Sequence, residues 1–272
     1  MKRELIAQRN PKSPIAEMFR TLRTNVQFMN SKKELKTILV TSTMPGEGKS
    51  WISSNLAITF AQSGKRVCLI DADMRKGRLA ELFQTDKVPG LSNYLSGIDN
   101  KGILESPDIL KYMKQTEIDG LFLLPAGNVP PNPSELLGTE TTVLMLENLK
   151  EIFDVIILDG TPGMLVTDAL ILSRISDTTI LVASHKTTKK EDLEKVKRSI
   201  ENVGGKIAGV VLNRKPVKAK EYSTSYYYGS THNNKSKHGK IDVDEVVRES
   251  SVAEAKQEEI LAQLRGYLDE EE

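Results

Sequence analysis

The sequence predicts an α/β fold, a doubly wound and mostly parallel sheet with helices on both faces. Short β-branched, apolar segments alternate along the chain with segments whose apolar residues recur at helical spacing. Several of the strand segments are apolar throughout, as expected of strands that are buried on two faces. The predicted strands span residues 37–41, 66–70, 121–124, 155–158, 179–183 and 207–212.

The helices are predicted from their first residues and from their apolar stripes. Ser13 and Pro14 form a helix start, because serine accepts hydrogen bonds from the first turn and proline fits the first helical position. Asn132 and Pro133 form a second start, with Glu135 three residues after the cap. The apolar stripes consist of Ile15, Phe19, Leu22 and Val26; of Ile52, Leu56 and Phe60; and of Leu193, Val196, Ile200 and Val203.

Composition limits the possible classes of protein. The 272 residues carry 38 Lys and Arg against 37 Asp and Glu, so no nucleic-acid surface is implied by net charge. The single cysteine, Cys68, lies in an apolar run, which favours a buried side chain and excludes a disulfide within one chain. We find no signal peptide and no run of eighteen apolar residues, so a cytoplasmic location is expected.

The chain is predicted to have one large domain with a segment before it and two after it. Residues 1–30 form the N-terminal helical segment and residues 31–214 the α/β domain. Residues 215–240 are rich in Lys, Ser, Asn and Tyr with few aliphatic residues, and this composition is typical of flexible tails. Residues 241–272 are acidic, and the helical spacing of their leucines predicts an amphipathic helix.

A glycine-rich segment follows the first predicted strand and ends in Gly48, Lys49 and Ser50. Backbone N–H groups of such a loop close around phosphate oxygens, and the following helix points its positive N-terminal end at them. The lysine reaches the outer phosphates and the serine ligates magnesium. The strict pattern has glycine where this chain has Thr43, and an ordinary turn would also use Gly48 for its positive φ. The predicted nucleotide-binding loop consists of Pro45, Gly46, Glu47, Gly48, Lys49, Ser50 and Trp51.

Three aspartates follow two other predicted strands. Asp71 and Asp73 come after the second strand, and Asp159 comes after the fourth. Ligands of open α/β sheets bind outside the carboxyl ends of the strands, which places all three beside the glycine loop. Each aspartate alone could instead cap a helix or start a turn. Together with the loop they predict a P-loop NTPase fold that binds ATP and Mg²⁺, with Ser50, Asp73 and Asp159 as metal ligands.

Asn213 ends the last predicted strand at the same edge. Its amide has the donor and acceptor needed to pair with a purine, which makes it a candidate for nucleotide binding. A turn-forming asparagine would fit the spacing equally well.

The motifs together resemble a family. The sequences EMFRTLR, PGEGKS, LIDADMR, LPAGNVPPNPSELL and ILDGTP, followed by a tyrosine cluster, are similar to those of the bacterial tyrosine kinases of capsular and exopolysaccharide biosynthesis, in their Gram-positive cytoplasmic form. The resemblance runs from about residue 11 to residue 213. It implies ATP-dependent transfer of phosphate to tyrosines in the tail of a neighbouring subunit, which regulates polysaccharide synthesis and export.

The resemblance also implies roles for particular residues. Lys49, Asp71, Asp73 and Asp159 would be catalytic, with Asp71 or Asp73 orienting or deprotonating the tyrosine hydroxyl. The helix pattern on Glu17, Arg20 and Arg23 would mediate assembly of a ring, an octamer in the family. On spacing alone, Glu17 and Arg20 could equally form a solvated pair worth about 0.2–0.5 kcal/mol. The predicted phosphoacceptors are Tyr222, Tyr226, Tyr227, Tyr228 and Tyr267.

Further partners are implied by the same resemblance. The cytoplasmic segment of a membrane protein that regulates polysaccharide chain length would activate the kinase and recruit it to the inner face of the membrane. A tyrosine phosphatase would reverse the reaction. The chain departs from the family pattern at Trp51, where a small hydroxyl residue is usual, at Gly163 after Pro162, and in the acidic segment beyond the tyrosine cluster.

Two other functions remain open on the sequence. Partitioning and division-site ATPases share the predicted core, but they need a second lysine where this chain has Met44. A nucleotide-dependent scaffold whose tail recruits partners would use the same binding residues without turnover.

Overall fold

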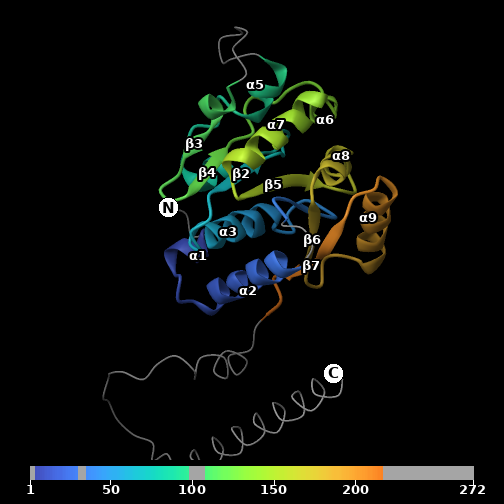
Figure 1. The fold of residues 1–272 in the computed structure, drawn as a ribbon. Helices are drawn as coiled ribbons and strands as arrows, with labels where there is room; N and C mark the ends of the chain where they lie inside the picture. The colour runs from blue at the N-terminus through green and yellow to red at the C-terminus, as the bar shows by residue number, and fades with distance from the viewer. Residues whose placement is uncertain (1–3, 30–34, 98–107, 217–272) are drawn as a thin grey trace, which may run out of the picture. The chain divides into compact units, whose positions relative to one another are not determined.

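The structure is a computed structural model that describes residues 4–29, 35–97 and 108–216. The predicted phosphoacceptor tyrosines and the acidic segment lie outside these residues. The described residues form an α/β fold around a seven-stranded sheet in the order β3-β4-β2-β5-β1-β6-β7 (Figure 1). The strands are β1 (Thr37–Ser42), β2 (Val67–Asp71), β3 (Lys114–Gln115), β4 (Leu121–Leu124), β5 (Val155–Pro162), β6 (Thr178–Ser184) and β7 (Ile207–Asn213).

The six predicted strands are all present, and several extend further toward their carboxyl ends. β5 continues to Pro162, so Asp159 lies within the strand and not after it. Neighbouring strands pair in parallel except β3 and β4, which are antiparallel. The sequence analysis missed β3, because Lys114 and Gln115 offer no apolar pattern.

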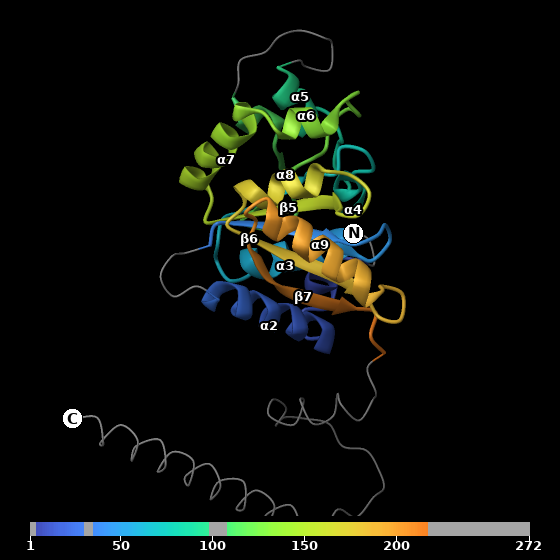
Figure 2. The same ribbon diagram turned by 90° about the vertical axis from the view of Figure 1, so that its right-hand side faces the viewer.

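Helices cover both faces of the sheet. The α-helices are α1 (Ile6–Arg9), α2 (Pro14–Phe28), α3 (Lys49–Ala61), α4 (Leu79–Phe83), α5 (Leu91–Ser96), α6 (Pro133–Leu137), α7 (Glu140–Ile152), α8 (Asp168–Ile175) and α9 (Lys190–Asn202), and a 3-10 helix, η1, spans Ile109–Tyr112. Figures 1 and 2 show α2 and α3 on one side of the sheet and α7 and α8 on the other.

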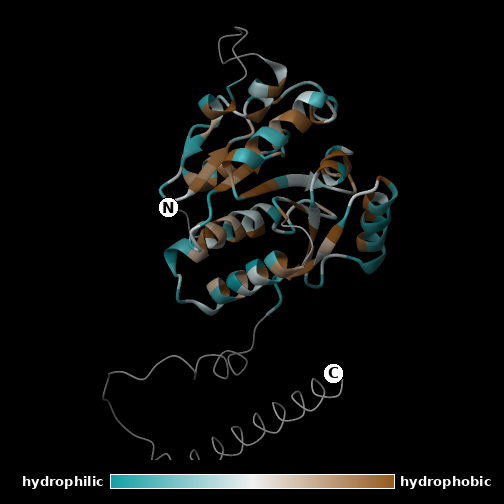
Figure 3. Ribbon diagram, in the orientation of Figure 1, coloured by the Kyte–Doolittle hydropathy of each residue, from teal (hydrophilic) through white to brown (hydrophobic). Residues whose placement is uncertain are grey.

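Alternate residues of the strands serve the two faces. Ile38 and Val40 pack with residues of α2 and α3, whereas Leu39 packs with residues of α7 and α8. The central parts of the strands are accordingly apolar, and Figure 3 shows much of the sheet in brown. Cys68 of β2 is free and fully buried, as the sequence predicted.

α3 is buried almost all round, which the sequence did not predict. Only the stripe of Ile52, Leu56 and Phe60 was apparent in the sequence. In the structure Ser53, Ser54 and Asn55 are also buried, because α1 and α2 pack on the side of α3 that faces away from the sheet. The N-terminal helical segment therefore belongs to the same compact unit as the sheet, a unit that spans Met1–Tyr222.

The two predicted helix starts differ in their capping. The Ser13 hydroxyl accepts a hydrogen bond from Ala16 N at 3.1 Å, which satisfies one of the free N–H groups of the first turn. Asn132 precedes α6 as predicted, but its side chain does not cap the backbone. It donates to the Glu135 carboxylate at 3.0 Å instead. No helix in the described part of the chain is long and apolar enough to cross a bilayer.

Candidate active site

The loop between β1 and α3 has the backbone geometry of a phosphate cradle. Gly46 and Gly48 have φ angles of 80° and 102°, which strongly favour glycine. A Cβ atom on Gly48 would lie 2.1 Å from Nδ2 of Asn213. Gly48 is therefore required both for its conformation and for the close approach of β7.

The side chain of Glu47 is used within the protein, and phosphate binding by its backbone stays a prediction. Its carboxylate is buried and turned into the loop, where it accepts hydrogen bonds from Thr43 N at 2.8 Å and Met44 N at 2.9 Å. The hydroxyl of Thr188, in the segment after β6, also donates to it. The Glu47 carboxylate thus stabilises the conformation of the loop by accepting hydrogen bonds from its backbone N–H groups, and it links the loop to the segment after β6.

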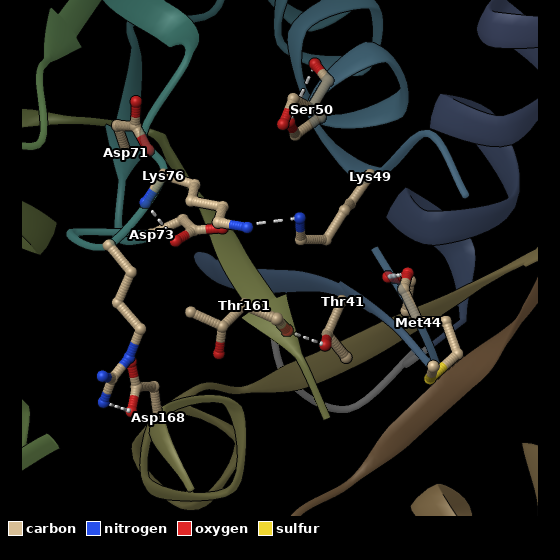
Figure 4. Close-up of polar contacts among 12 residues, drawn as sticks. Thr41, Met44, Lys49, Ser50, Asp71, Asp73, Lys76, Thr161 and Asp168 are labelled. Atoms are coloured by element: carbon tan, nitrogen blue, oxygen red, sulfur yellow. Dashed lines mark hydrogen bonds and ion pairs between the residues drawn. The ribbon is translucent and has the colours of Figure 1, made fainter. Parts of the chain in front are cut away.

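Lys49 is the first residue of α3 and is 9% exposed. Its Nζ lies 3.5 Å from Oδ2 of Asp73, and Oδ1 of Asp73 accepts a hydrogen bond from Lys76 N at 2.9 Å (Figure 4). The loop lysine and one of the predicted aspartates are therefore brought together as expected.

Asp71 and Asp159 are paired across the neighbouring strands β2 and β5. Both side chains are buried, and Oδ2 of Asp71 accepts a hydrogen bond from Leu79 N at 2.9 Å. Burial, followed by the charge of Asp159, raises the pKa of Asp71 well above its usual range. Burial also raises the pKa of Asp159 to about 6, although the Lys49 charge opposes the shift.

This carboxylate pair fits a bound cation. Oδ1 of Asp71 and both carboxylate oxygens of Asp159 accept no hydrogen bond of normal geometry from the described residues. The Ser50 and Ser53 hydroxyls nevertheless lie near enough to Asp159 to oppose the rise that burial causes in its pKa. Buried carboxylates without partners are costly unless a positive charge compensates them. Mg²⁺ is held by one or two carboxylates together with phosphate and water, and the described residues contain no larger cluster of metal-binding side chains. Asp159, Asp73 and the Ser50 hydroxyl are the residues suited to hold it.

A cavity of about 590 Å³ lies over the loop and the carboxyl ends of the strands. Its volume suits a nucleotide-sized ligand. Most of the predicted loop residues line it, whereas Glu47, Asp71 and Asp159 do not. The lining residues are Glu4, Pro45, Gly46, Gly48, Lys49, Ser50, Trp51, Asp73, Arg75, Lys76, Arg78, Leu82, Thr161, Pro162, Leu165, Val166, Asn213 and Arg214.

Arg75 is a site residue that the sequence analysis did not single out. Its guanidinium forms two hydrogen bonds with the fully buried carboxylate of Asp168, at 3.0 and 3.1 Å. Ser134 donates to the same carboxylate at 2.6 Å. This network joins the β2–α4 segment to α6 and α8. The only sequence signal was the position of Arg75 in the LIDADMR motif, because Asp168 is 93 residues away.

Asn213 lines the cavity, as predicted, but its amide is used within the protein. Nδ2 donates to the carbonyl of Glu47 at 2.9 Å, and Oδ1 accepts from Arg214 N at 2.8 Å. Asn213 therefore clamps the loop to the end of β7. Pairing with a purine stays a prediction.

Trp51 connects the cavity to α2. It lines the cavity, and its ring packs edge-to-face against Phe19 with centroids 5.0 Å apart. Trp51 stands where the family usually has a small hydroxyl residue. Its ring fills space between α3 and α2, the helix that carries the predicted interface residues.

The three predicted interface residues of α2 do not behave alike. Arg20 pairs with Glu17 and also donates to the Pro11 carbonyl, all at exposed positions. Arg23 instead donates to the carbonyl of Thr59 in α3 at 2.7 Å and is partly buried. Arg23 thus has a function within the subunit. A role in assembly stays a prediction for all three.

Residues 38–261 match the family model CbiA, the CobQ/CobB/MinD/ParA nucleotide binding domain. The chain is similar to the tyrosine-protein kinase YwqD of Bacillus subtilis, with 35% identity over 233 residues that cover 86% of this chain and 94% of that protein. It is also similar to the solved structure of the chimerical protein CapA2B2, with a TM-score of 0.73 and 34% identity, covering 80% of this chain and 92% of that one.

A solved structure from the competing class is more distant. The cell division ATPase MinD of Pyrococcus furiosus gives a TM-score of 0.55 and 24% identity, covering 70% of this chain and 79% of that one. At this identity the likeness shows the fold alone. Met44, at the position of the second lysine of that class, is 44% exposed and supplies no cation.

Proposed function

This chain belongs to the bacterial tyrosine-protein kinases, within the CobQ/CobB/MinD/ParA nucleotide-binding class, and on this premise we propose that it transfers phosphate from ATP to tyrosines of a neighbouring copy. The reaction regulates the synthesis and export of capsular or extracellular polysaccharide. The observation that carries this proposal is the group formed by Lys49, Asp73 and the buried pair of Asp71 and Asp159 beside a nucleotide-sized cavity.

The loop residues bind and neutralise the triphosphate. The first two residues of α3, Lys49 and Ser50, line the cavity, so the positive N-terminal end of the helix lies there, and Lys49 supplies a positive charge for the outer phosphates. When bound, Mg²⁺ supplies further positive charge to the phosphates. Its ligands from the protein would be Ser50, Asp73 and Asp159.

An aspartate orients the acceptor tyrosine or accepts its proton. A tyrosine hydroxyl has a pKa of about 10, so a carboxylate that orients it or accepts its proton lowers the barrier. Asp71 and Asp73 are both candidates. Asp73 lines the cavity and Asp71 does not, but Asp73 also lies beside Lys49 and is a proposed ligand of Mg²⁺, so both stay candidates.

Assembly and recruitment complete the proposal. A ring of subunits would place the tail of one copy at the cavity of the next, with α2 at the contact. The cytoplasmic segment of a membrane regulator of chain length would activate the enzyme and hold it at the inner face of the membrane. A tyrosine phosphatase would remove the phosphates.

The proposal is tested with the purified full chain, ATP, Mg²⁺ and the activating segment. We expect phosphotyrosine within residues 222–228, detected by mass spectrometry. Replacing Lys49 by Met should reduce the rate at least about 100-fold, since one preorganised electrostatic contact of a transition state is worth that much. Lys195→Met, an exposed change on α9, is the matched control and should keep the wild-type rate. ATP consumption without phosphotyrosine would contradict the kinase assignment.

A further inference from the structure

One part of the cavity lining is basic, and we call it the basic wall. Arg75, Lys76 and Arg78 lie within four residues in the segment between β2 and α4, and all three line the cavity. Asp168 compensates the charge of Arg75. Lys76 and Arg78 are exposed, and neither forms an ion pair with any described residue. Two positive charges without a salt-bridge partner among the described residues therefore line the cavity.

Another part of the lining is apolar, and we call it the apolar wall. Pro162 at the end of β5 and Leu165 and Val166 between β5 and α8 line the same cavity, and Leu165 is 55% exposed. An apolar surface that stays exposed beside a catalytic group is typical of a binding site for an apolar or aromatic group. The two walls together suit a segment that carries an aromatic side chain, a neighbouring aliphatic side chain and negative charge.

The sequence of this chain contains such a segment. Tyr267 is followed by Leu268 and then by four carboxylates, Asp269 to Glu272. The other candidate acceptors lack this context. Tyr222 has one acidic neighbour, Glu221, and lysines at 218 and 220, and no acidic residue stands between Tyr226 and Gly229.

We propose that the basic and apolar walls form an acceptor subsite that selects a tyrosine with acidic residues on its C-terminal side, and that Tyr267 of a neighbouring copy is the preferred acceptor. This inference rests on the proposed kinase function and names its substrate class. Lys76 and Arg78 are then specificity-determining residues, which attract the carboxylates at 269–272 while Leu165 and Val166 contact Leu268.

The chemical step is the same as for any acceptor of this kinase. The phenol oxygen of Tyr267 forms a bond to the γ-phosphorus of ATP, and the bond from that phosphorus to the β–γ bridging oxygen breaks. ADP leaves with the bonding electron pair, and the phenol proton passes to a carboxylate of the site. The products are phosphotyrosine and ADP.

The size of the preference follows from exposed ion pairs. Pairs of this kind contribute up to about 1 kcal/mol each, which corresponds to a factor of about five. Two such pairs at about 0.7 kcal/mol each, within that range, should favour Tyr267 about ten-fold over the tyrosines at 222–228. Salt screens the attraction between exposed charges. The preference for Tyr267 should therefore become smaller when the NaCl concentration rises from 50 to 500 mM.

The experiment follows phosphorylation of the full chain with ATP and Mg²⁺, using quantitative mass spectrometry of the early time points. The readout is the ratio of phosphate at Tyr267 to phosphate at 222–228 within one sample, so a change in overall rate does not affect it. We expect a ratio of about ten, a fall toward one in the double variant Lys76→Ala/Arg78→Ala, and no change in the control Lys195→Ala/Lys197→Ala on α9. Charge reversal at Lys76 and Arg78 should be rescued by lysines at 269–272.

Several outcomes would overturn the inference. Equal early phosphorylation of Tyr267 and of residues 222–228 in the wild-type chain is one. Another is a Lys76→Ala/Arg78→Ala variant with a raised KM for ATP and an unchanged ratio, since the basic wall would then serve the nucleotide. Phosphate at 222–228 without phosphate at Tyr267 removes this inference and leaves the kinase assignment intact. ATP consumption with no phosphotyrosine at all removes both.

Discussion

At the residue scale, Asp159 makes an unusual contribution to stability. Its carboxylate is fully buried beside Asp71, and its pKa in the folded protein is about 6, against about 3.9 for an unfolded chain. Between these values the folded state holds the proton more firmly than the unfolded state does. The stabilisation from protonated Asp159 is therefore complete below pH 4 and is lost as the pH rises through 6.

Replacing Asp159 by Asn should thus stabilise the protein when no metal or nucleotide is bound. The difference of about two pKa units corresponds to about 2–3 kcal/mol in the free energy of unfolding at pH 7.5, because each unit is worth 1.36 kcal/mol. Urea denaturation in EDTA between pH 4.5 and 7.5 measures it. Asp86→Asn, an exposed control, should leave the pH dependence unchanged. An Asp159→Asn protein that is less stable than wild type at pH 7.5 would contradict a net cost of burying this carboxylate in its charged form.

Gly48 offers a second prediction at this scale. Alanine there would be strained by the φ of 102° and would also collide with Nδ2 of Asn213. Backbone strain of this kind costs about 1–3 kcal/mol, so if the loop relieves it by leaving its binding conformation the affinity for ATP should fall about 5- to 150-fold in isothermal titration. Gly64 has a φ of 84° with no atom within 4 Å of its added Cβ, which makes Gly64→Ala the matched control. That control should lose stability but keep its affinity.

The sequence predicted the residues of the site better than their contacts. Lys49, Asp73 and the loop were identifiable because their chemistry is contained in short motifs. The inward turn of Glu47 was not, since Thr188 is 141 residues away. The bond of Arg75 with Asp168 was missed for the same reason. Contacts between distant segments depend on the sheet order, which local patterns do not contain.

At the scale of elements, α2 separates two arginines that the sequence pattern treats as equivalent. Arg20 bonds only at exposed positions near its own helix, so Arg20→Ala should change the free energy of unfolding by less than about 0.5 kcal/mol. Arg23→Ala removes a charged hydrogen bond to the carbonyl of Thr59 in α3 and should cost about 1.5–3 kcal/mol. Guanidinium denaturation measures both changes, and light scattering shows whether either variant still forms large oligomers.

The two variants then distinguish assembly from folding. Loss of oligomers in the Arg20→Ala protein, at nearly wild-type stability, would support a surface role for α2. An Arg23→Ala protein that is as stable as wild type would show that its bond to α3 matters little. Large oligomers in both variants would argue against any role of this helix in assembly.

Element boundaries follow a similar logic. The predicted strands were found because their apolar runs are continuous, and α2 was found because one face meets α3 while the other is exposed. α3 was only partly predicted, since serines and an asparagine are buried on its far side under α1 and α2. β3 has only two residues and is defined by its pairing with β4, which the sequence does not reveal.

At the scale of the whole molecule, the sheet order explains why one site can draw on the entire chain. β1 lies between β5 and β6. The loop after β1 therefore receives Asp159 and Asp71 from one side and Thr188 and Asn213 from the other. The location of the site at the carboxyl edge was predictable from the general rule for open α/β sheets.

A truncation after Pro216 tests whether the described core is self-sufficient. The described core ends at Pro216, so removing residues 217–272 should shift the melting temperature by less than about 3 °C, the change that about 1 kcal/mol causes in a domain of this size. The truncated protein should bind ATP, lose self-phosphorylation and still phosphorylate an added peptide of residues 262–272. Calorimetry and peptide phosphorylation measure this. A drop of more than about 8 °C would show that the tail supports the fold.

The thiol of Cys68 can report how often the core of this fold opens. It is the single cysteine of the chain, it lies fully buried in β2, and burial raises the pKa of its thiol. A maleimide or disulfide reagent can modify it only after the centre of the sheet has opened. The labelling rate of the untagged protein therefore reports how often the core opens, and it can be compared between free, nucleotide-bound and assembled states without adding any probe.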